Sequence, residues 1–168
     1  MGSYGAGKAE CCDWIRRNFH MDATVLDVGA CDGIWQSILP EYDIDAVEAF
    51  TPNAEKLKAN GKYINVYNVN IKDYKYDWYD LIIFGDVIEH MDVETAQAVL
   101  KYAWPRCRDM IVAVPFLYEQ GEVYGNPFER HIQPELTFKL FAERYPDFEV
   151  LVQPTQNYCY YHKKNGLI

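Results

Sequence analysis

The sequence predicts a single α/β domain: a doubly wound, mostly parallel seven-stranded sheet with a C-terminal antiparallel hairpin and helices on both faces. Short β-branched or apolar segments alternate along the chain with segments whose apolar residues recur at helical spacing. Residues 81–84 are apolar without interruption, which is typical of a strand covered on both faces. The last two strand-like segments are separated only by residues 153–156, too few for a parallel crossover, so we expect them to pair antiparallel.

The first half of the chain alternates helices and strands. Cys12, Ile15 and Phe19 share one face of the first predicted helix. Pro40 stops the second helix, and Gly61 closes the third. In chain order we expect a helix over 6–19, a strand over 24–28, a helix over 34–39, a strand over 44–48, a helix opened by Thr51 as N-cap with Pro52 at its first position, and a strand over 63–67.

The second half continues this alternation around one long loop, residues 116–133. In chain order we expect a strand over 80–84, a helix capped by Asp92, a strand over 110–114 ended by Pro115, the loop, a helix opened by Pro134, and strands over 148–152 and 157–161. Ligands of such sheets bind at the carboxyl ends of the strands, so we expect the functional residues in the loops at that edge.

Length and composition indicate one domain over residues 1–168. A chain of this length, of which 49% is hydrophobic, can bury one substantial core. We expect residues 1–20 to supply a helix and a lid, and residues 116–133 to form a loop on the substrate side. The sequence has no run of about 18 apolar residues that could cross a bilayer and no apolar segment of a signal peptide near Met1, which predicts a cytoplasmic protein without a membrane partner.

The net charge, the cysteine content and the N-terminal residues limit the ligands and partners to be expected. The formal net charge of −9 opposes attraction to phosphate backbones, so nucleic acid is not an expected partner. The five cysteines form no CxxC pair, so we expect reduced thiols and no bound metal. Residues 2–9 mimic a phosphate-binding loop but lack a preceding strand and a Ser or Thr after Lys8, which argues against ATP.

The strongest functional signal is the segment 25–33, Val-Leu-Asp-Val-Gly-Ala-Cys-Asp-Gly. Gly29 permits a tight bend and a close approach of the backbone to a ligand, and Gly33 lets the next helix begin against that bend. Glu48 follows Asp27 by 21 positions, at the end of the next strand, where a carboxylate can accept two hydrogen bonds from a ribose diol. A tight structural turn and a surface glutamate are the simpler interpretations of each feature alone, but their combination favours a ribose-containing ligand.

A third segment, residues 79–90, is an apolar strand that ends abruptly in Gly-Asp-Val-Ile-Glu-His. Together with the glycine turn and Glu48, it resembles the class I S-adenosylmethionine-dependent methyltransferases, in particular the branch with an Asp-Val-Leu-Glu-His-like signature after the fourth strand. The resemblance covers about residues 4–163. It implies a cofactor, S-adenosylmethionine, and transfer of its methyl group to an acceptor that the sequence does not identify.

The resemblance also implies roles for individual residues. The cofactor-binding residues it implies are Asp27, Gly29 and Gly33 around the methionine part with Ala30 in the same turn, Glu48 at the ribose, Ala49 and Phe50 beside the adenine, Asn70 and Ile71 at the adenine edge, Gly85 at the methionine end and Tyr4 as a lid residue. Two positions depart from the family pattern. Cys31 stands where the middle glycine of the turn is usual, and Asn70 stands where an acid often meets the adenine amino group, so its oxygen would accept that hydrogen bond without charge assistance.

Methyl transfer from a sulfonium requires alignment of the acceptor and exclusion of water more than it requires covalent chemistry. A hydroxyl or protonated amine acceptor also needs a base, for which Asp86, His90 and His131 are the candidates. We favour His131, because it follows a long loop that can cover the substrate, whereas His90 begins a helix, where a packed imidazole is the simpler interpretation.

Two other functions remain open at this stage. A binding or regulatory module would keep the cofactor residues without turnover. A nicotinamide-dependent oxidoreductase would carry GxGxxG, but positions 31 and 34 are Cys and Ile. The short segments available to cover a substrate favour a small-molecule acceptor, while a protein acceptor and a homodimer that completes the site stay compatible with the sequence.

Overall fold

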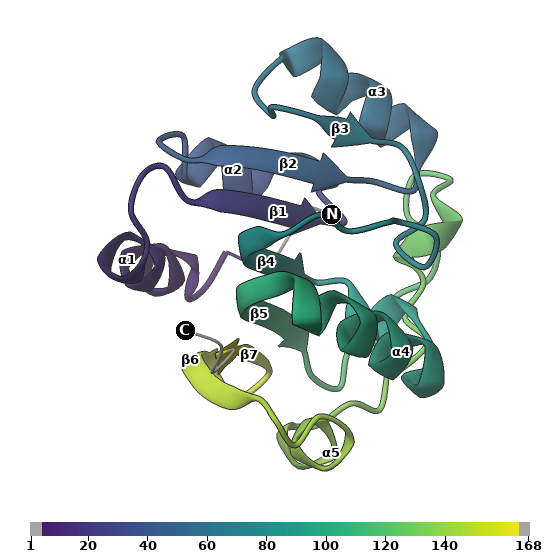
Figure 1. Ribbon diagram of the computed structural model, residues 1–168. Helices are drawn as coiled ribbons and strands as arrows, with labels where there is room; N and C mark the ends of the chain where they lie inside the picture. The colour runs from purple at the N-terminus through teal and green to yellow at the C-terminus, as the bar shows by residue number, and fades with distance from the viewer. Residues whose placement is uncertain (1–4, 165–168) are drawn as a thin grey trace.

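The computed structural model describes residues 5–164, and the implied lid residue Tyr4 lies outside that range (Figure 1). Its sheet has the strand order β3-β2-β1-β4-β5-β7-β6. The pairs β2–β3, β1–β2, β1–β4 and β4–β5 are parallel, whereas β7 pairs antiparallel with both β5 and β6. The predicted doubly wound sheet and its C-terminal hairpin are therefore confirmed.

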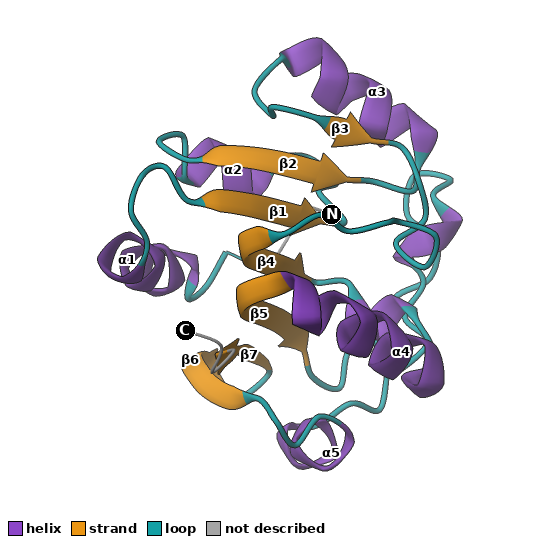
Figure 2. Ribbon diagram, in the orientation of Figure 1, coloured by secondary structure: helices purple, strands orange, loops and turns teal. Residues whose placement is uncertain are grey.

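Helices and strands alternate from α1 to β3 and again from β4 to β5, but no helix separates β3 from β4, as Figure 2 shows by colour. The strands are β1 (Thr24–Val28), β2 (Asp43–Val47), β3 (Val66–Tyr67), β4 (Tyr79–Gly85), β5 (Cys107–Pro115), β6 (Glu149–Thr155) and β7 (Tyr158–Lys164). The α-helices are α1 (Lys8–Asn18), α2 (Ile34–Ile38), α3 (Thr51–Asn60), α4 (Val93–Ala103) and α5 (Phe138–Arg144), and short 3-10 turns are η1 (Ile88–His90), η2 (Trp104–Arg106) and η3 (Pro127–Glu129).

Two apolar layers sandwich the sheet. On one face, α1, α2 and α3 supply Ile15, Trp35 and Leu57 to a cluster with inward residues of β1 and β4. On the other, α4 and α5 supply Leu100 and Phe141 to a second cluster with the alternate residues of the same strands. Leu81, Ile82, Ile83 and Phe84 have no exposed surface, which confirms that β4 is covered on both faces.

Several predicted boundaries need correction. Thr51 is the first residue of α3 and not its N-cap: Phe50 occupies the cap position without a side-chain bond, and the Thr51 hydroxyl donates to Asn68 instead. Pro52 does lie in the first turn, and Gly61 ends the helix with a φ of 60°. The third strand shrinks from five residues to the pair Val66–Tyr67.

The last helix begins later than predicted. Pro134 does not open it, because Thr137 is its N-cap and accepts a hydrogen bond from the backbone N–H of Leu140 at 3.1 Å. The preceding residues form a turn in which Leu136 is fully buried. By contrast, Asp92 caps α4 as predicted and accepts from the N–H of Thr95 at 2.8 Å.

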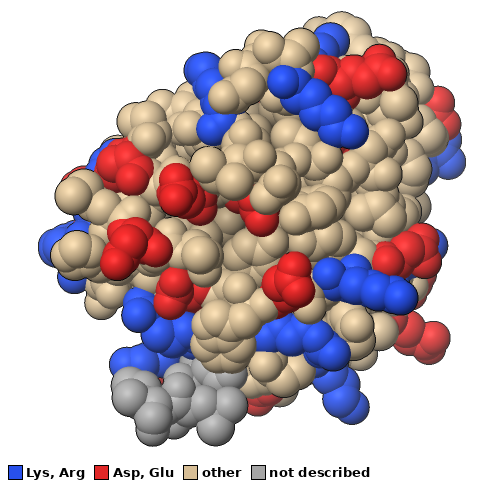
Figure 3. Space-filling model, turned by 45° about the horizontal axis from the view of Figure 1, so that its top comes forward, with Lys and Arg blue, Asp and Glu red and all other residues tan. Residues whose placement is uncertain are grey.

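Within the described range no helix has the length and apolarity needed to span a bilayer. On the face shown in Figure 3, Lys and Arg side chains are interspersed with Asp and Glu.

Candidate functional site

A cavity of about 760 Å³ lies at the carboxyl ends of β1, β2, β4 and β5. Its walls include the turn after β1, the end of β2, the residues after β4 and much of the segment 116–132. This volume falls in the range of small-molecule and cofactor sites. The parallel strands thus bring together at one edge the loops in which the sequence placed the function.

Most of the implied cofactor residues line this cavity. Those that do are Gly29, Ala30, Glu48, Ala49, Asn70, Ile71 and Gly85. Asp27, Gly33 and Phe50 do not line it, and the structure gives each of them a supporting contact described below.

The glycine turn keeps the backbone after β1 close to the cavity. Gly29 has a φ of 69°, and a Cβ at this position would lie 2.7 Å from Val87 Cγ2. Gly33 has a φ of 77°, and a Cβ there would meet Leu57 at 3.1 Å, so this glycine lets α2 begin against α3. Cys31, between them, adopts a φ of 47°, which is left-handed backbone that favours glycine. The turn therefore has left-handed backbone at Cys31 as well as at the two glycines.

Glu48 joins the end of β2 to this turn. Its Oε2 accepts a hydrogen bond from the N–H of Cys31 at 2.8 Å, and its Oε1 accepts one from the N–H of Phe50 at 2.7 Å. Burial raises the pKa of Glu48, and these two backbone donors oppose that rise. A carboxylate offers about four acceptor sites, so roughly two remain for a ligand at the cavity wall.

Asp27 lies beneath the turn and not in the cavity wall. Its side chain is buried and accepts a hydrogen bond from the Tyr63 hydroxyl at 2.5 Å. Burial raises the pKa of Asp27 to about 7, although the Tyr63 bond and the charge of Lys8 act in the opposite direction. The bonded pair links the end of β1 to the residues before β3, so Asp27 supports the turn from below.

Of the residues implied at the adenine, Asn70, Ile71 and Ala49 line the cavity and Phe50 does not. Asn70 lines the cavity, but its Oδ1 already accepts a hydrogen bond from the N–H of Lys72 at 3.1 Å. Ile71 and Ala49 add apolar surface on the same wall. Phe50 contributes its N–H to Glu48 and begins α3.

Gly85 ends β4 against the indole of Trp35. A Cβ at this position would lie 2.5 Å from Trp35 Nε1, so a larger residue would displace the ring. Trp35 Nε1 is buried without a hydrogen-bond partner in the described residues. Because Gly85 has no side chain, the Trp35 ring can pack closely against the end of β4 at the floor of the cavity.

All three candidate bases line the cavity. Asp86 has a φ of 58°, and its Oδ1 accepts a hydrogen bond from the Tyr158 hydroxyl at 2.6 Å. His90 and His131 lie together, with ring centroids 4.8 Å apart, although 41 positions separate them in the sequence. The chain brings them together because the N–H groups of Ile132 and Gln133 both donate to the backbone oxygen of Glu89.

The two imidazoles are held in the same way. His90 Nδ1 lies 3.2 Å from the carbonyl oxygen of Arg130, and His131 Nδ1 lies 2.8 Å from that of Tyr118. A carbonyl only accepts, so both Nδ1 atoms carry hydrogen, which leaves Nε2 with a lone pair in the neutral ring. Burial lowers the pKa of both histidines and so favours that neutral form.

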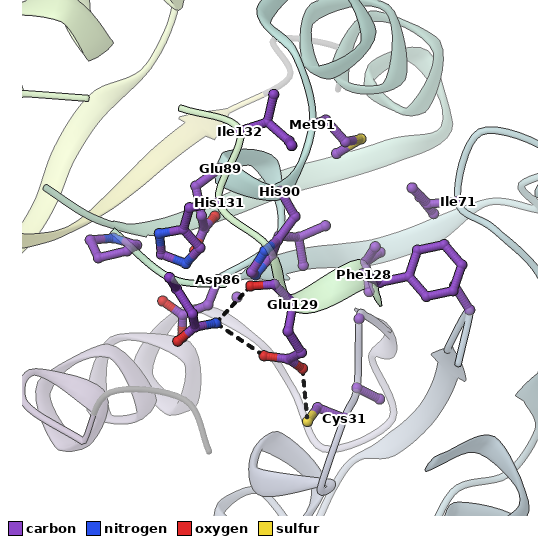
Figure 4. A pocket seen from close by; sticks show the side chains of 18 of the residues that line it. Cys31, Ile71, Asp86, Glu89, His90, Met91, Phe128, Glu129, His131 and Ile132 are labelled. Atoms are coloured by element: carbon purple, nitrogen blue, oxygen red, sulfur yellow. Dashed lines mark hydrogen bonds between the residues drawn. The ribbon is translucent and has the colours of Figure 1, made fainter. Parts of the chain in front are cut away.

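Sequence reasoning missed the wall supplied by Glu129. Figure 4 shows its carboxylate facing Cys31, whose Sγ lies 3.8 Å from Glu129 Oε1. The Gln120 amide holds Glu129 in place, donating to its backbone oxygen at 2.8 Å and to its carboxylate at 3.3 Å. No local motif marks these residues, because their role depends on how the segment 116–133 folds back over the sheet.

No protein-family model matches the chain, and no curated protein sequence is detectably similar to it. Solved structures are similar in fold. The DhpI–SAM–HEP complex superposes with a TM-score of 0.72 at 12% identity, covering 93% of this chain and 84% of that one. An S-adenosylmethionine-dependent methyltransferase from Clostridium acetobutylicum gives 0.68 at 13% identity, with 95% and 90% covered.

A third similar structure is the 1,6-didemethyltoxoflavin-N1-methyltransferase of Burkholderia thailandensis, with bound 1,6-didemethyltoxoflavin and S-adenosylhomocysteine. It has a TM-score of 0.65 and 18% identity, and the match covers 86% of this chain and 71% of that one. The chain thus has the fold of the class I S-adenosylmethionine-dependent methyltransferases, as the sequence resemblance predicted.

Proposed function

We propose that this protein is a methyltransferase that binds S-adenosylmethionine in the cavity and methylates a small-molecule acceptor. The placement of Glu48 carries the proposal. A buried carboxylate at the end of β2 accepts backbone N–H groups from two loops and keeps acceptor sites for a diol. The similar structures named above include complexes with the cofactor or its demethylated product, which supports the same ligand here.

The residues present suit that cofactor. Gly29 brings a bare backbone to the cavity, Glu48 suits a ribose, and Ile71 with Ala49 offers apolar surface to an adenine ring. When bound, S-adenosylmethionine supplies a methyl group already activated on a positively charged sulfur. The chain must then hold the acceptor in line and exclude water.

The acceptor would lie on the side formed by the segment 116–132. Apolar side chains line this side and remain partly exposed, with Leu117 67% and Ile132 49% accessible. The imidazoles of His90 and His131 line the same cavity, and each neutral ring keeps a nitrogen lone pair that can accept a proton or bind a cation. An acceptor with an apolar body and a hydroxyl or amine at the histidines fits this arrangement.

A thermal-shift experiment tests the cofactor. S-adenosylhomocysteine at one hundred times its dissociation constant should stabilise the native state by about 2.7 kcal/mol, whereas ATP and NAD should give no shift. An equal shift with NAD would contradict the proposal. Transfer of labelled methyl from S-adenosylmethionine into a metabolite extract then tests turnover, and binding without any transfer would support a regulatory module instead.

A further inference from the structure

Three potential metal ligands meet in the cavity wall: Glu89, His90 and His131. One ligand atom of each lies within 4.8 Å of the other two. The first two residues belong to η1, and the third lies in the segment that folds back from β5. Figure 4 shows the three side chains converging on the same side of the cavity.

The carboxylate of Glu89 is buried and has no hydrogen-bond partner within residues 5–164. The residue is 1% exposed, and neither Oε1 nor Oε2 has a hydrogen-bond partner among the described residues. Leaving a buried carboxylate unpaired is costly, and buried carboxylates in proteins are normally hydrogen-bonded, paired or bound to a metal.

The two histidines are oriented as metal ligands are. A ligating imidazole usually donates its second ring N–H to a carbonyl or carboxylate, which fixes the tautomer and aims the other nitrogen at the ion. Here Arg130 and Tyr118 supply those carbonyls, at 3.2 Å and 2.8 Å from the respective Nδ1 atoms. In both rings this bond fixes the hydrogen on Nδ1 and leaves Nε2 as the atom that can bind an ion.

We propose that Glu89, His90 and His131 bind one divalent transition-metal ion at the acceptor side of the cavity. Two imidazoles and one carboxylate suit first-row ions such as Fe²⁺, Co²⁺ and Zn²⁺, and this ligand set leaves coordination positions open. Because all three residues line the cavity, an acceptor could reach those positions. His131 is then a ligand and not the base that the sequence suggested, since one Nε2 lone pair cannot serve both roles.

Metal uptake can be measured without any methyl transfer. The full chain would be stripped with EDTA, exchanged into chelator-free buffer and titrated with Co²⁺, followed by equilibrium dialysis and elemental analysis. We expect one ion per chain. Glu89→Gln and His131→Ala should each weaken Co²⁺ binding by at least the tenfold to hundredfold that loss of an outer-shell partner costs. His20→Ala is the matched control, because His20 is an exposed histidine far from the cavity wall and should bind Co²⁺ like the wild type.

Absence of Co²⁺ uptake by the wild type, or equal uptake by the wild type and both variants, would overturn the assignment. Circular dichroism and S-adenosylhomocysteine binding of each variant report whether the fold survives. If Glu89→Gln does not fold, His131→Ala and His90→Ala decide the matter alone. The metal site and the proposed function can fail separately, because ion uptake and S-adenosylhomocysteine binding are measured independently on one preparation.

Discussion

Glu48 and Cys31 are joined at the edge of the sheet by a 2.8 Å hydrogen bond from the Cys31 N–H to the Glu48 carboxylate. The bond connects the turn after β1 to the end of β2, and a second bond from Phe50 holds the other carboxylate oxygen. Glu48 therefore has both a structural role in the turn and acceptor capacity that faces the cavity. A substitution of Glu48 removes both contributions, so the fold and the ligand affinity of the variant must both be measured.

We expect Glu48→Ala to weaken S-adenosylhomocysteine binding by roughly tenfold to a few hundredfold. Hydrogen bonds to a charged group contribute about 1.5–3 kcal/mol each, and about 1.4 kcal/mol is a factor of ten in affinity. Titration calorimetry measures the effect, with circular dichroism to confirm the fold. Glu55→Ala, an exposed change on α3, is the control. A folded Glu48→Ala variant with unchanged affinity would remove Glu48 from the ribose site.

The left-handed backbone of Cys31 predicts that stability falls in the order Cys31→Gly, wild type, Cys31→Val. Left-handed backbone costs an L-residue about 1–2 kcal/mol, a cost that glycine avoids. Glycine in turn lowers the free energy of unfolding by about 0.4–1 kcal/mol, because it has more conformational freedom in the unfolded chain. The thiol contacts to Glu129 and Asn53, at 3.8 Å and 3.7 Å, are weak. Cys31→Gly should thus be as stable as the wild type or more stable by up to about 1 kcal/mol.

Cys31→Val should be clearly less stable in the same series, because a β-branched residue tolerates positive φ poorly. Urea unfolding of the three proteins checks the order. If valine were tolerated as well as glycine, strain at this turn would not explain the family's preference for glycine.

Gly85→Ala should destabilise the protein by about 1–3 kcal/mol, the usual cost of overpacking a well-packed core. The added Cβ would lie 2.5 Å from Trp35 Nε1 on the cavity floor. Gly121→Ala is the matched control, since nothing lies within 4 Å of a Cβ at that position. Thermal unfolding compares the two variants, and equal melting points would show that the Trp35 ring moves at little cost.

The positions of the glycine turn and of Glu48 in the candidate site could be predicted from the sequence, because they depend on short-range patterns. The turn from Gly29 to Gly33 and the position of Glu48 follow from strand lengths and from the parallel pairing of β1 with β2. Local sequence cannot show that Asp27 points below the cavity toward Tyr63, because Tyr63 comes from a segment 36 positions away. It also cannot show that Glu129 faces Cys31 or that Glu89 has no hydrogen-bond partner in the described part of the chain, since both depend on how the segment after β5 folds back.

His131→Ala should leave S-adenosylhomocysteine affinity nearly unchanged and slow methyl transfer by at least about tenfold to hundredfold, because loss of a proposed ligand weakens binding of the ion on the acceptor side. His131 lies with His90 in the cavity wall where we propose that the acceptor binds, and Glu48 is the residue that we propose for the ribose of the cofactor. Calorimetry and single-turnover kinetics separate the two effects. His20→Ala again serves as the control, and unchanged turnover in His131→Ala would exclude any direct part in acceptor activation.

The buried carboxyl of Asp27 should make stability depend on pH in a defined direction. Its pKa rises from 3.8 to about 7 on folding, so the native state holds a proton that the unfolded chain releases at lower pH. The stabilising effect of that proton is complete below about pH 4 and is lost as pH rises through 7.

Asp27→Asn keeps an acceptor for the Tyr63 hydroxyl but cannot ionise. Relative to the wild type, the variant should gain stability by up to roughly 4 kcal/mol between pH 4 and pH 7, at about 1.4 kcal/mol per unit. Urea unfolding across this range measures the difference, and Asp22→Asn, at an exposed aspartate, should show no such trend. A pH-independent difference between Asp27→Asn and the wild type would mean that Asp27 is ionised in the folded protein throughout, held in that form by Lys8 and Tyr63 against its burial.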